Sequence, residues 1–321
     1  MIVDILFMVL GLVLILVGAN CLTDGASAIA KRWGLSDLVI GLTVVAFGTS
    51  APELVISIVS ALNGSSELAI GNVVGSNIFN VLVIIGVTSM VSPVKIERSV
   101  MTNDIPFVML SALALLAIGN SPLLDGATAP TVTRVSGILL LLFFAIFMRY
   151  TFSQASYAAP SDPSAVVVKP MPLWKSIIWV VGGLAALVFG GDRFVAGASG
   201  IASGLGVSDA IIGLTIVAAG TSLPELATSV TAALKGRPGI ALGNVIGSNI
   251  FNIFLVLGSA ATIRPLAFGS INNVDLLTLT VACLLFWLFG WFFKERTITR
   301  VEGGVLTACY IAYVIIQITN L

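Results

Sequence analysis

The sequence contains no histidine, and its three cysteines stand apart in apolar surroundings without a CxxC spacing. The absence of histidine excludes histidine-ligated zinc sites, Ser-His-Asp triads and imidazole proton relays. Isolated cysteines in apolar sequence are typical of small buried residues, here Cys21, Cys283 and Cys309. The sequence therefore predicts no cofactor and no enzyme.

Charge is scarce as well, because only 9% of the 321 residues are charged while 58% are hydrophobic. Soluble domains carry about 25% charged residues, so the composition predicts a polytopic membrane protein rather than a soluble protein with a very large core. The net charge is zero and no basic tail is present, which gives no indication of nucleic-acid binding. The expected surroundings are the lipid bilayer.

Ten segments are apolar over the roughly 20 residues that a helix needs to cross a bilayer. They lie near 3–29, 37–61, 67–91, 104–121, 131–151, 173–199, 209–233, 239–262, 273–293 and 301–319. The longest hydrophilic connection, 153–172, is rich in Pro and Ser and is interpreted as a linker. The expected fold is therefore all-α, with a five-helix half over 1–152, a cytoplasmic linker over 153–172 and a second five-helix half over 173–321.

Basic residues predict the orientation of these helices. Numbered from the N-terminus, the odd connections hold 12 Lys and Arg residues, whereas the even connections hold Arg134 and Arg264. Positive charge favours the cytoplasmic side. The odd connections are therefore expected inside and both termini outside, in the plasma (inner) membrane.

A repeat dominates the sequence. A shift of 172 residues aligns 36–80 with 208–252 without a gap, at about 28 identities in 45 positions. The identities concentrate on Gly, Thr, Ser, Pro, Glu and Asn, which chance similarity between apolar segments does not explain. Because five helices separate the copies, they are expected to cross the membrane in opposite directions. Inverted repeats are typical of secondary transporters, although some channels share this symmetry.

The first repeated motif is "GTSAPE" at 48–53, which recurs as "GTSLPE" at 220–225. On a helix, Thr49 and Ser50 share a face with Glu53. Pro52 lacks an N–H and leaves the carbonyl of Gly48 unpaired, which membrane segments tolerate where backbone lines a cavity or coordinates a ligand. The second copy repeats the arrangement with Gly220, Thr221, Ser222, Pro224 and Glu225.

The second repeated motif is "GNVVGSNIFN" at 71–80, which recurs as "GNVIGSNIFN" at 243–252. Asn72, Ser76 and Asn80 are spaced by four residues and share one helical face. Their counterparts are Asn244, Ser248 and Asn252. The small-xxx-small glycine pairs of both motifs allow close helix approach. The pairs are Gly71 with Gly75 and Gly243 with Gly247.

These motifs supply oxygen ligands without imidazole or thiolate, which favours hard cations such as Ca²⁺ or Na⁺. A serine, threonine or asparagine in a membrane helix can equally bond to backbone or join helices. A glutamate near a helix centre costs about 2.5–3.5 kcal/mol on insertion scales, and here the cost is incurred twice, at Glu53 and Glu225. We therefore expect these two residues to be functional. Asp24, Asp37, Asp104 and Asp209, which lie near predicted helix ends, are interpreted as caps or interface anchors.

With these motifs and ten helices, the whole chain resembles the cation/calcium antiporter superfamily, in particular the prokaryotic sodium/calcium exchangers. The resemblance implies that Glu53 and Glu225 bridge central metal sites, with Thr49 and Thr221 among the metal ligands. It also implies two Na⁺ sites: one toward the inner side, from Thr49, Ser50, Ser76 and the carbonyl of Ala46, and one toward the outer side, from Thr221, Ser222, Ser248 and the carbonyl of Ala218. Asn80 and Asn252 would flank the middle, while Asn72, Asn244, Gly48, Gly220, Pro52 and Pro224 are expected to be structural.

One position departs from the family pattern, because an archaeal relative has Asp where this chain has Asn252. The pocket then carries a formal charge of −2, which one Ca²⁺ neutralises and three Na⁺ would exceed by one. The resemblance implies electrogenic exchange of three Na⁺ for one Ca²⁺ by alternating access, in a protein that functions as a monomer. Ca²⁺/H⁺ exchange, a passive cation channel and a non-transporting scaffold are the alternatives, and the paired glutamates disfavour the last.

Overall fold

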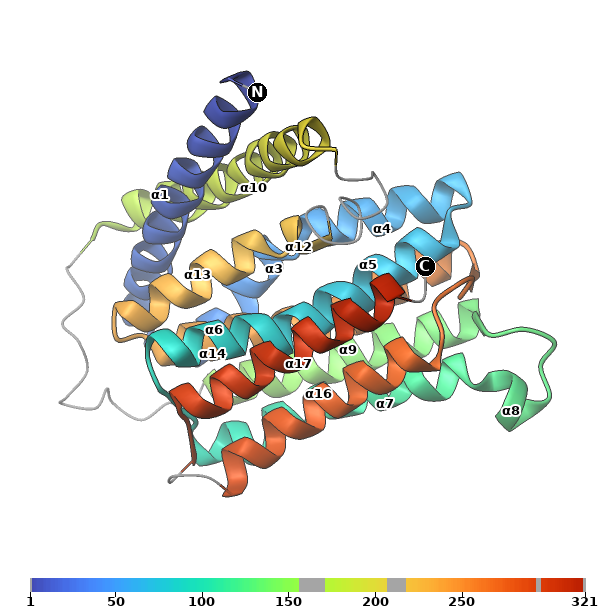
Figure 1. Cartoon of the computed structure of the whole chain (residues 1–321). Coiled ribbons are helices and arrows are strands. Elements are labelled where there is room, and N and C mark those ends of the chain that lie inside the picture. The colour runs from blue at the N-terminus through green and yellow to red at the C-terminus, as the bar shows by residue number, and fades with distance from the viewer. Residues whose placement is uncertain (1, 156–170, 207–217, 293–295, 320–321) are drawn as a thin grey trace.

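The computed structural model describes residues 2–155, 171–206, 218–292 and 296–319, and these residues form a bundle of long helices (Figure 1). Eight single helices in this part are long and apolar enough to cross a membrane. They are α1 (Ile2–Trp33), α5–η2–α6 (Ser66–Val91), η3–α7 (Val100–Gly119), α9 (Arg134–Ala155), α10 (Leu173–Gly204), α14–η5–α15 (Pro238–Ile263), α16 (Asn273–Phe292) and α17 (Arg300–Thr319), where η marks a π-helical stretch.

A further span is bent by 46° between Asp37–Thr49, which comprises α2 (Asp37–Ile40), η1 (Gly41–Val45) and α3 (Ala46–Thr49), and α4 (Ala51–Asn63). The all-α membrane fold is thereby confirmed. Of the predicted segment 209–233, residues 209–217 lie outside the described residues, and α12 (Ala218–Gly220) and α13 (Leu223–Leu234) form the described remainder. The linker 153–172 also lies largely outside them. A short helix that was not expected, α8 (Ser121–Asp125), follows α7.

Proline sets the break between α3 and α4. Ser50 has φ −84° and ψ 4°, outside helical geometry, and Pro52 lies in the first two positions of α4. Ser222 repeats this with φ −93° and ψ 6° before α13, where Pro224 occupies the equivalent position. Proline suits a helix start because it has no N–H to bond to the preceding turn. Each repeat therefore restarts a helix just before its glutamate.

Two short strand pairs reveal how the halves are related. β1 (Val94–Lys95), which follows α6, pairs antiparallel with β4 (Thr297–Ile298), which precedes α17. β2 (Thr131–Val132), which precedes α9, pairs antiparallel with β3 (Leu266–Ala267), which follows α15. Each pair joins the end of the third helix of one half to the start of the fifth helix of the other half.

Within one half those two points lie at opposite ends of the bundle, because the fourth helix crosses it between them. They can meet across the halves only if the halves run in opposite directions. The expected inverted repeat is therefore confirmed.

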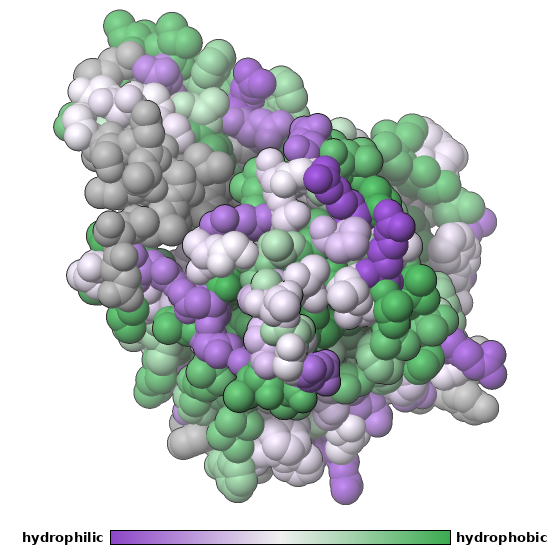
Figure 2. Space-filling model, turned by 90° about the vertical axis from the view of Figure 1, so that its right-hand side faces the viewer, coloured by the Kyte–Doolittle hydropathy of each residue, from purple (hydrophilic) through white to green (hydrophobic). Residues whose placement is uncertain are grey.

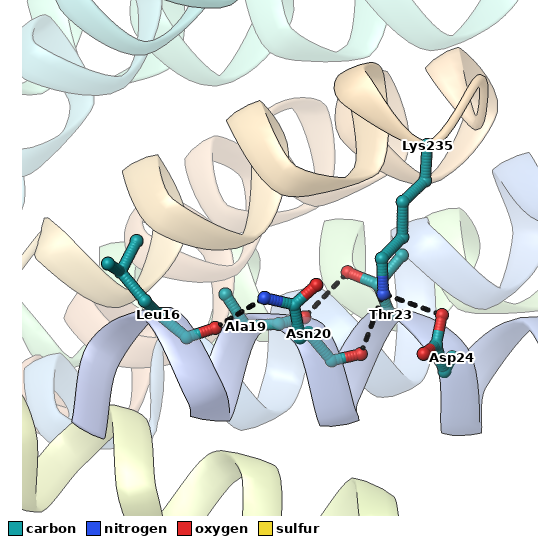
Figure 3. Close-up of polar contacts among 6 residues, drawn as sticks. All are labelled: Leu16, Ala19, Asn20, Thr23, Asp24 and Lys235. Carbon is teal, nitrogen blue, oxygen red and sulfur yellow. Dashed lines mark hydrogen bonds and ion pairs between the residues drawn. The ribbon is translucent and has the colours of Figure 1, made fainter. Parts of the chain in front are cut away.

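At the end of the bundle that carries the odd-numbered connections, polar contacts join helices of the two halves. Lys235, after α13, donates from Nζ to Oδ1 of Asp24 on α1 at 2.6 Å and to the backbone oxygen of Asn20 at 3.1 Å (Figure 3). Arg237 pairs with Asp37 of α2 at 3.3 Å. Asp24 and Asp37 of the first half therefore pair with basic residues of the second half at this end of the bundle.

At the other end, which carries the even-numbered connections, polar contacts also join the two halves. Ser270 donates to the Glu67 carboxylate, and Asn120 and Asn273 exchange amide hydrogen bonds of 2.8 and 2.9 Å. The space-filling view of one end of the bundle shows hydrophilic side chains across that end, with hydrophobic side chains gathered around it (Figure 2). This distribution suits a protein whose helix ends meet water and whose sides meet lipid.

The centre of the bundle is formed by α14–η5–α15 and α5–η2–α6. In their most apolar windows 94% and 78% of residues are buried, against 11% in α17 and 22% in α1 and α9. The outer helices instead expose large hydrophobic side chains. The second repeated motif, at 71–80 and 243–252, therefore lies on the two most deeply buried of these helices.

α1 and α10 pack against each other as an antiparallel pair along a line of glycines. A Cβ at Gly18 would lie 2.8 Å from the carbonyl oxygen of Gly183, and a Cβ at Gly183 would lie 2.7 Å from the backbone nitrogen of Leu22. A real Cβ does not fit at these distances. The two helices can thus approach only with glycine at these positions.

We predict that Gly183→Ala lowers the midpoint of thermal unfolding in detergent, because overpacking typically costs about 1–3 kcal/mol. Gly182→Ala is the matched control, since nothing lies within 4 Å of a Cβ at Gly182, and it should leave the midpoint unchanged or slightly higher. Equal midpoints for the two variants would contradict the close packing of α1 and α10.

Candidate cation site

Glu53 and Glu225 occupy the first turns of α4 and α13 and are each 1% exposed. Each has one carboxylate oxygen, Oε2, that is buried without a hydrogen-bond partner. The helix starts beneath them contribute partial positive charge from free N–H groups. An unpaired buried carboxylate oxygen is nevertheless costly, which marks both positions as places where a cation would be stabilised.

The two glutamates come together across the repeats. Glu225 lies close enough to Glu53 for electrostatic repulsion, and Thr49 and Ser50 of the first half interact with its carboxylate. The Ser50 hydroxyl lies 3.5 Å from Oε1 of Glu225. Glu53 in turn interacts with Thr221 of the second half. Each glutamate therefore meets the Thr-Ser motif of the opposite repeat.

We define the central polar cluster as the six side chains that these contacts join. Ser76 of α5 is its remaining member, beside the Glu53 carboxylate. The cluster comprises Thr49, Ser50, Glu53, Ser76, Thr221 and Glu225.

Two asparagines anchor the helix breaks. Asn72 donates from Nδ2 to the hydroxyl of Ser57 at 3.1 Å and to the carbonyl of Glu53 at 3.4 Å. Asn244 makes the equivalent bonds, to Ser229 at 2.9 Å and to the carbonyl of Glu225 at 3.2 Å. Both residues were expected to be structural, and their bonds hold the backbone of each glutamate.

Asn244 makes one further contact in the described part of the chain, since its Oδ1 accepts a 3.0 Å hydrogen bond from Thr49. Thr49 in addition lies 3.4 Å from the carbonyl oxygen of Ala46, which is fully buried. The hydrogen bond between Asn244 and Thr49 therefore connects α14 of the second half to the helix break of the first half.

The other predicted ligands are buried on neighbouring elements. Ser222, Ser248, Asn80 and Asn252 are at most 1% exposed. Each has an oxygen without a hydrogen-bond partner in the described part of the chain. α4, which carries Glu53, packs against η5 (Phe251–Leu257), and α13, which carries Glu225, packs against η2 (Asn80–Ile84). Ala218 begins α12.

Four of the six glycines singled out in the sequence make close contacts. A Cβ at Gly48 would lie 2.5 Å from side-chain atoms of Leu184 on α10, and a Cβ at Gly220 would clash with Val195 on the same helix. A Cβ at Gly243 would lie 2.6 Å from the carbonyl oxygen of Leu38, and a Cβ at Gly247 would lie 2.6 Å from the Cβ of Ala46. In the described part of the chain, a Cβ at Gly71 would lie 3.4 Å from the Ile271 side chain, an ordinary contact, and nothing lies within 4 Å of a Cβ at Gly75.

The sequence reasoning missed two residues and did not foresee the burial of a third. Asn77 and Asn249, also repeated, are 0% and 1% exposed and contact each other across the halves. Their conserved spacing between the two copies was the available signal. Asp104, interpreted as a cap or anchor, stands at the N-cap position of α7 (Ile105–Gly119), but its side chain makes no capping hydrogen bond and is 3% exposed.

The π-helical stretches were not foreseen. Two of them contain predicted ligands, and η1 ends directly before Ala46. Asn80 opens η2, and Asn252 is the second residue of η5. π-helical turns interrupt the regular i→i−4 ladder and occur frequently at functional sites. They alter which side chains face the bundle interior at these points.

The site offers two carboxylates, hydroxyls and amide oxygens, which are the ligands that Ca²⁺ and Na⁺ prefer. Within the described ranges, no three His, Cys, Asp or Glu side chains gather into a metal-binding group. Two negative charges among neutral oxygens therefore suit a hard cation rather than zinc or copper.

Comparison with known proteins gives one consistent result. The sodium/calcium exchanger protein family matches residues 3–153 and 175–319. A protein of Alkalimonas amylolytica named putative antiporter CaxA is 40% identical over 98% of both chains. The sodium/calcium exchanger MaX1 of Methanosarcina acetivorans is 34% identical over 98% of both chains. The inner membrane protein YrbG of Escherichia coli is 34% identical over 87% of both.

The fold is also similar to a solved structure. The sodium-calcium exchanger NCX_Mj superposes with a TM-score of 0.83 at 32% identity, covering 98% of each chain. That work on NCX_Mj concerns extracellular ion exchange and induced occlusion of its binding site. The likeness extends over both halves of the chain.

We predict that Asn244→Leu destabilises the protein more than Asn72→Leu. Among the described residues, Asn244 makes three hydrogen bonds and is fully buried, whereas Asn72 makes two and is partly buried. Because buried groups left unpaired cost about 1–3 kcal/mol, the midpoint of thermal unfolding in detergent should fall further for Asn244→Leu. Equal losses would show that the bond to Thr49 contributes nothing.

Proposed function

The chain belongs to the sodium/calcium exchanger family, whose members are secondary transporters and not enzymes, and we propose that it exchanges Na⁺ for Ca²⁺ across the membrane. The observation that carries this proposal is the pair of buried glutamates, each with an unpaired carboxylate oxygen. MaX1 and NCX_Mj, both named sodium/calcium exchangers, support the identity of the ions.

The charge of the site supports exchange rather than one-way binding. Glu53 and Glu225 repel each other when both are ionised, so an empty site with two ionised carboxylates resists closure. A Ca²⁺ ion, or Na⁺ ions that use the same carboxylates, removes that repulsion. Because both ions need Glu53 and Glu225, occupancy by one excludes the other, and the protein releases one ion to carry the other.

The position of the α1–α10 pair supports alternating access. α1 packs along α13 of the second half, but no contact of similar extent links α10 with α4 in the described part of the chain. The pair thus departs from the symmetry that relates the two repeats. A shift of α1 and α10 toward α4 would give the mirror arrangement and open the opposite end.

The distribution of Lys and Arg residues indicates which side of the membrane the closed end of the bundle faces. Lys235 and Asp24 join α13 to α1 at the end that carries the odd connections. Because these connections hold most Lys and Arg residues, we place this end in the cytoplasm and both termini outside. The structure then corresponds to a state closed toward the cytoplasm. We propose a monomer in the inner membrane, built of halves 1–152 and 173–321 around the linker.

We expect Na⁺-loaded proteoliposomes of the purified protein to take up ⁴⁵Ca²⁺ when diluted into Na⁺-free buffer. Glu53→Gln and Glu225→Gln should each lower this uptake at least about 30-fold, because losing a buried charged partner costs about 2 kcal/mol or more. Asp125→Asn is the control, since Asp125 is an exposed carboxylate on α8.

A pH gradient without Na⁺ separates the alternatives. Uptake driven by the pH gradient alone would replace the proposal with Ca²⁺/H⁺ exchange. Calcium movement that only ever runs down its own gradient would replace it with a channel. Full uptake by Glu53→Gln would remove the glutamate pair from the mechanism.

The Lys235–Asp24 pair yields a prediction about access. Its side chains are 28% and 45% exposed, so the pair stabilises the cytoplasmically closed state by up to about 1 kcal/mol. Lys235→Gln should therefore lower the half-saturating Ca²⁺ concentration on the cytoplasmic side up to about fivefold and raise it on the outer side.

The measurement compares inside-out with right-side-out vesicles. Asp37→Asn is the matched control, because it removes an ion pair at the same end that does not involve α1. If Lys235→Gln changed neither side, or changed both in the same direction, the pair would have no role in access.

A further inference from the structure

Asn77 and Asn249 occupy equivalent positions in the two repeats but make different hydrogen bonds. Asn77 donates from Nδ2 to the backbone oxygen of Asn249 at 3.1 Å, and its Oδ1 accepts from Nδ2 of Asn252 at 3.0 Å. Asn249 instead donates to the carbonyl of Val245 in its own helix at 2.7 Å, and its Oδ1 has no partner. Symmetry is therefore broken at this pair.

The bonds of Asn77 form a chain whose direction is fixed at one end. A backbone carbonyl can only accept a hydrogen bond. The carbonyl of Asn249 therefore requires the NH₂ group of Asn77, which leaves Oδ1 of Asn77 facing Asn252. Asn252 must then present its own NH₂ group to Asn77. Its oxygen is left on the other side of the amide.

That oxygen is buried and free. Asn252 is 1% exposed, and its Oδ1 has no hydrogen-bond partner in the described part of the chain. Asn252 lies on η5, which packs against the helix that carries Glu53. A reversed amide would present N–H donors in place of this oxygen and would repel a cation.

We propose that Asn77 is a positioning residue that holds the Asn252 amide with its oxygen available to the cation, an inference that rests on the proposed function. Asn77 need not touch the ion. Its role is to select one of two amide orientations that are nearly equal in shape. Asn249 makes no hydrogen bond to Asn80 among those described, so the first half lacks the equivalent constraint.

The test compares Asn77→Ala with Asn249→Ala, which remove the same atoms from equivalent, fully buried positions. Asn249→Ala keeps the backbone carbonyl that Asn77 needs. We expect Asn77→Ala to raise the Ca²⁺ dissociation constant about tenfold, measured by calorimetry on the intact protein in detergent. Asn249→Ala should change it less than about twofold, a shift below the cost of one hydrogen bond.

A double-mutant cycle with Asn252→Asp distinguishes positioning from a general loss of packing. A carboxylate presents oxygen in either orientation and cannot donate to Asn77. In the Asn252→Asp background, Asn77→Ala should therefore cost little or even improve Ca²⁺ affinity. The inference would be overturned if Asn77→Ala lowered Ca²⁺ affinity equally in the wild-type and Asn252→Asp backgrounds. It would also be overturned if Asn77→Ala and Asn249→Ala had equal effects on Ca²⁺ affinity.

The outcomes for the two proposals are separable. Failure of the wild-type protein to bind Ca²⁺ would remove the proposed function and this inference together. Wild-type Ca²⁺ binding and Na⁺-driven uptake, combined with indistinguishable alanine variants, would remove the inference alone.

Discussion

The structure depends on two carboxylates held against each other inside a helix bundle. A charged residue near a membrane helix centre costs about 2.5–3.5 kcal/mol on insertion scales, and the proximity of Glu53 and Glu225 adds repulsion. The surroundings offset part of this cost through helix starts, hydroxyls and anchoring asparagines, yet one oxygen of each carboxylate stays unpaired. The part of the burial cost that these groups do not offset is the free energy that we assign to driving cation binding.

The inverted repeat makes this arrangement possible. Each half supplies one glutamate on a helix that proline and serine restart, and the opposite half supplies the hydroxyls beside it. The strand pairs β1–β4 and β2–β3 join the halves at both ends. Among the described residues, the symmetry is broken at the α1–α10 pair, at Asn77 and also at Asn244. The first difference suits a transporter that alternates between two states, and the second suits a site that binds an ion in one preferred geometry.

Much of this could be predicted because membrane helices have few polar residues. A proline beside a glutamate in apolar sequence has few structural explanations, so the break at Ser50 could be predicted from the motif, whereas the functional role of Glu53 stays a prediction. The direction of the repeats followed from the odd number of intervening helices. The roles of Ca²⁺ and Na⁺ ligands for individual side chains remain predictions.

Other features could not be predicted, since they depend on contacts between distant segments. The π-helical turns at Asn80 and near Asn252 arise from packing between helices, and periodicity does not record them. The burial of Asp104 depends on how the start of its helix sits in the bundle. The different bonding of Asn77 and Asn249 is invisible in sequence, because the two copies are identical there.

The most direct test is an anomalous difference map from crystals soaked in Sr²⁺, a heavier ion that accepts the same oxygen ligands as Ca²⁺. The account predicts a single strong peak between the carboxylates of Glu53 and Glu225 that fades when Na⁺ is raised. A map with no peak there, or with carboxylates turned apart and the ion bound elsewhere, would contradict it.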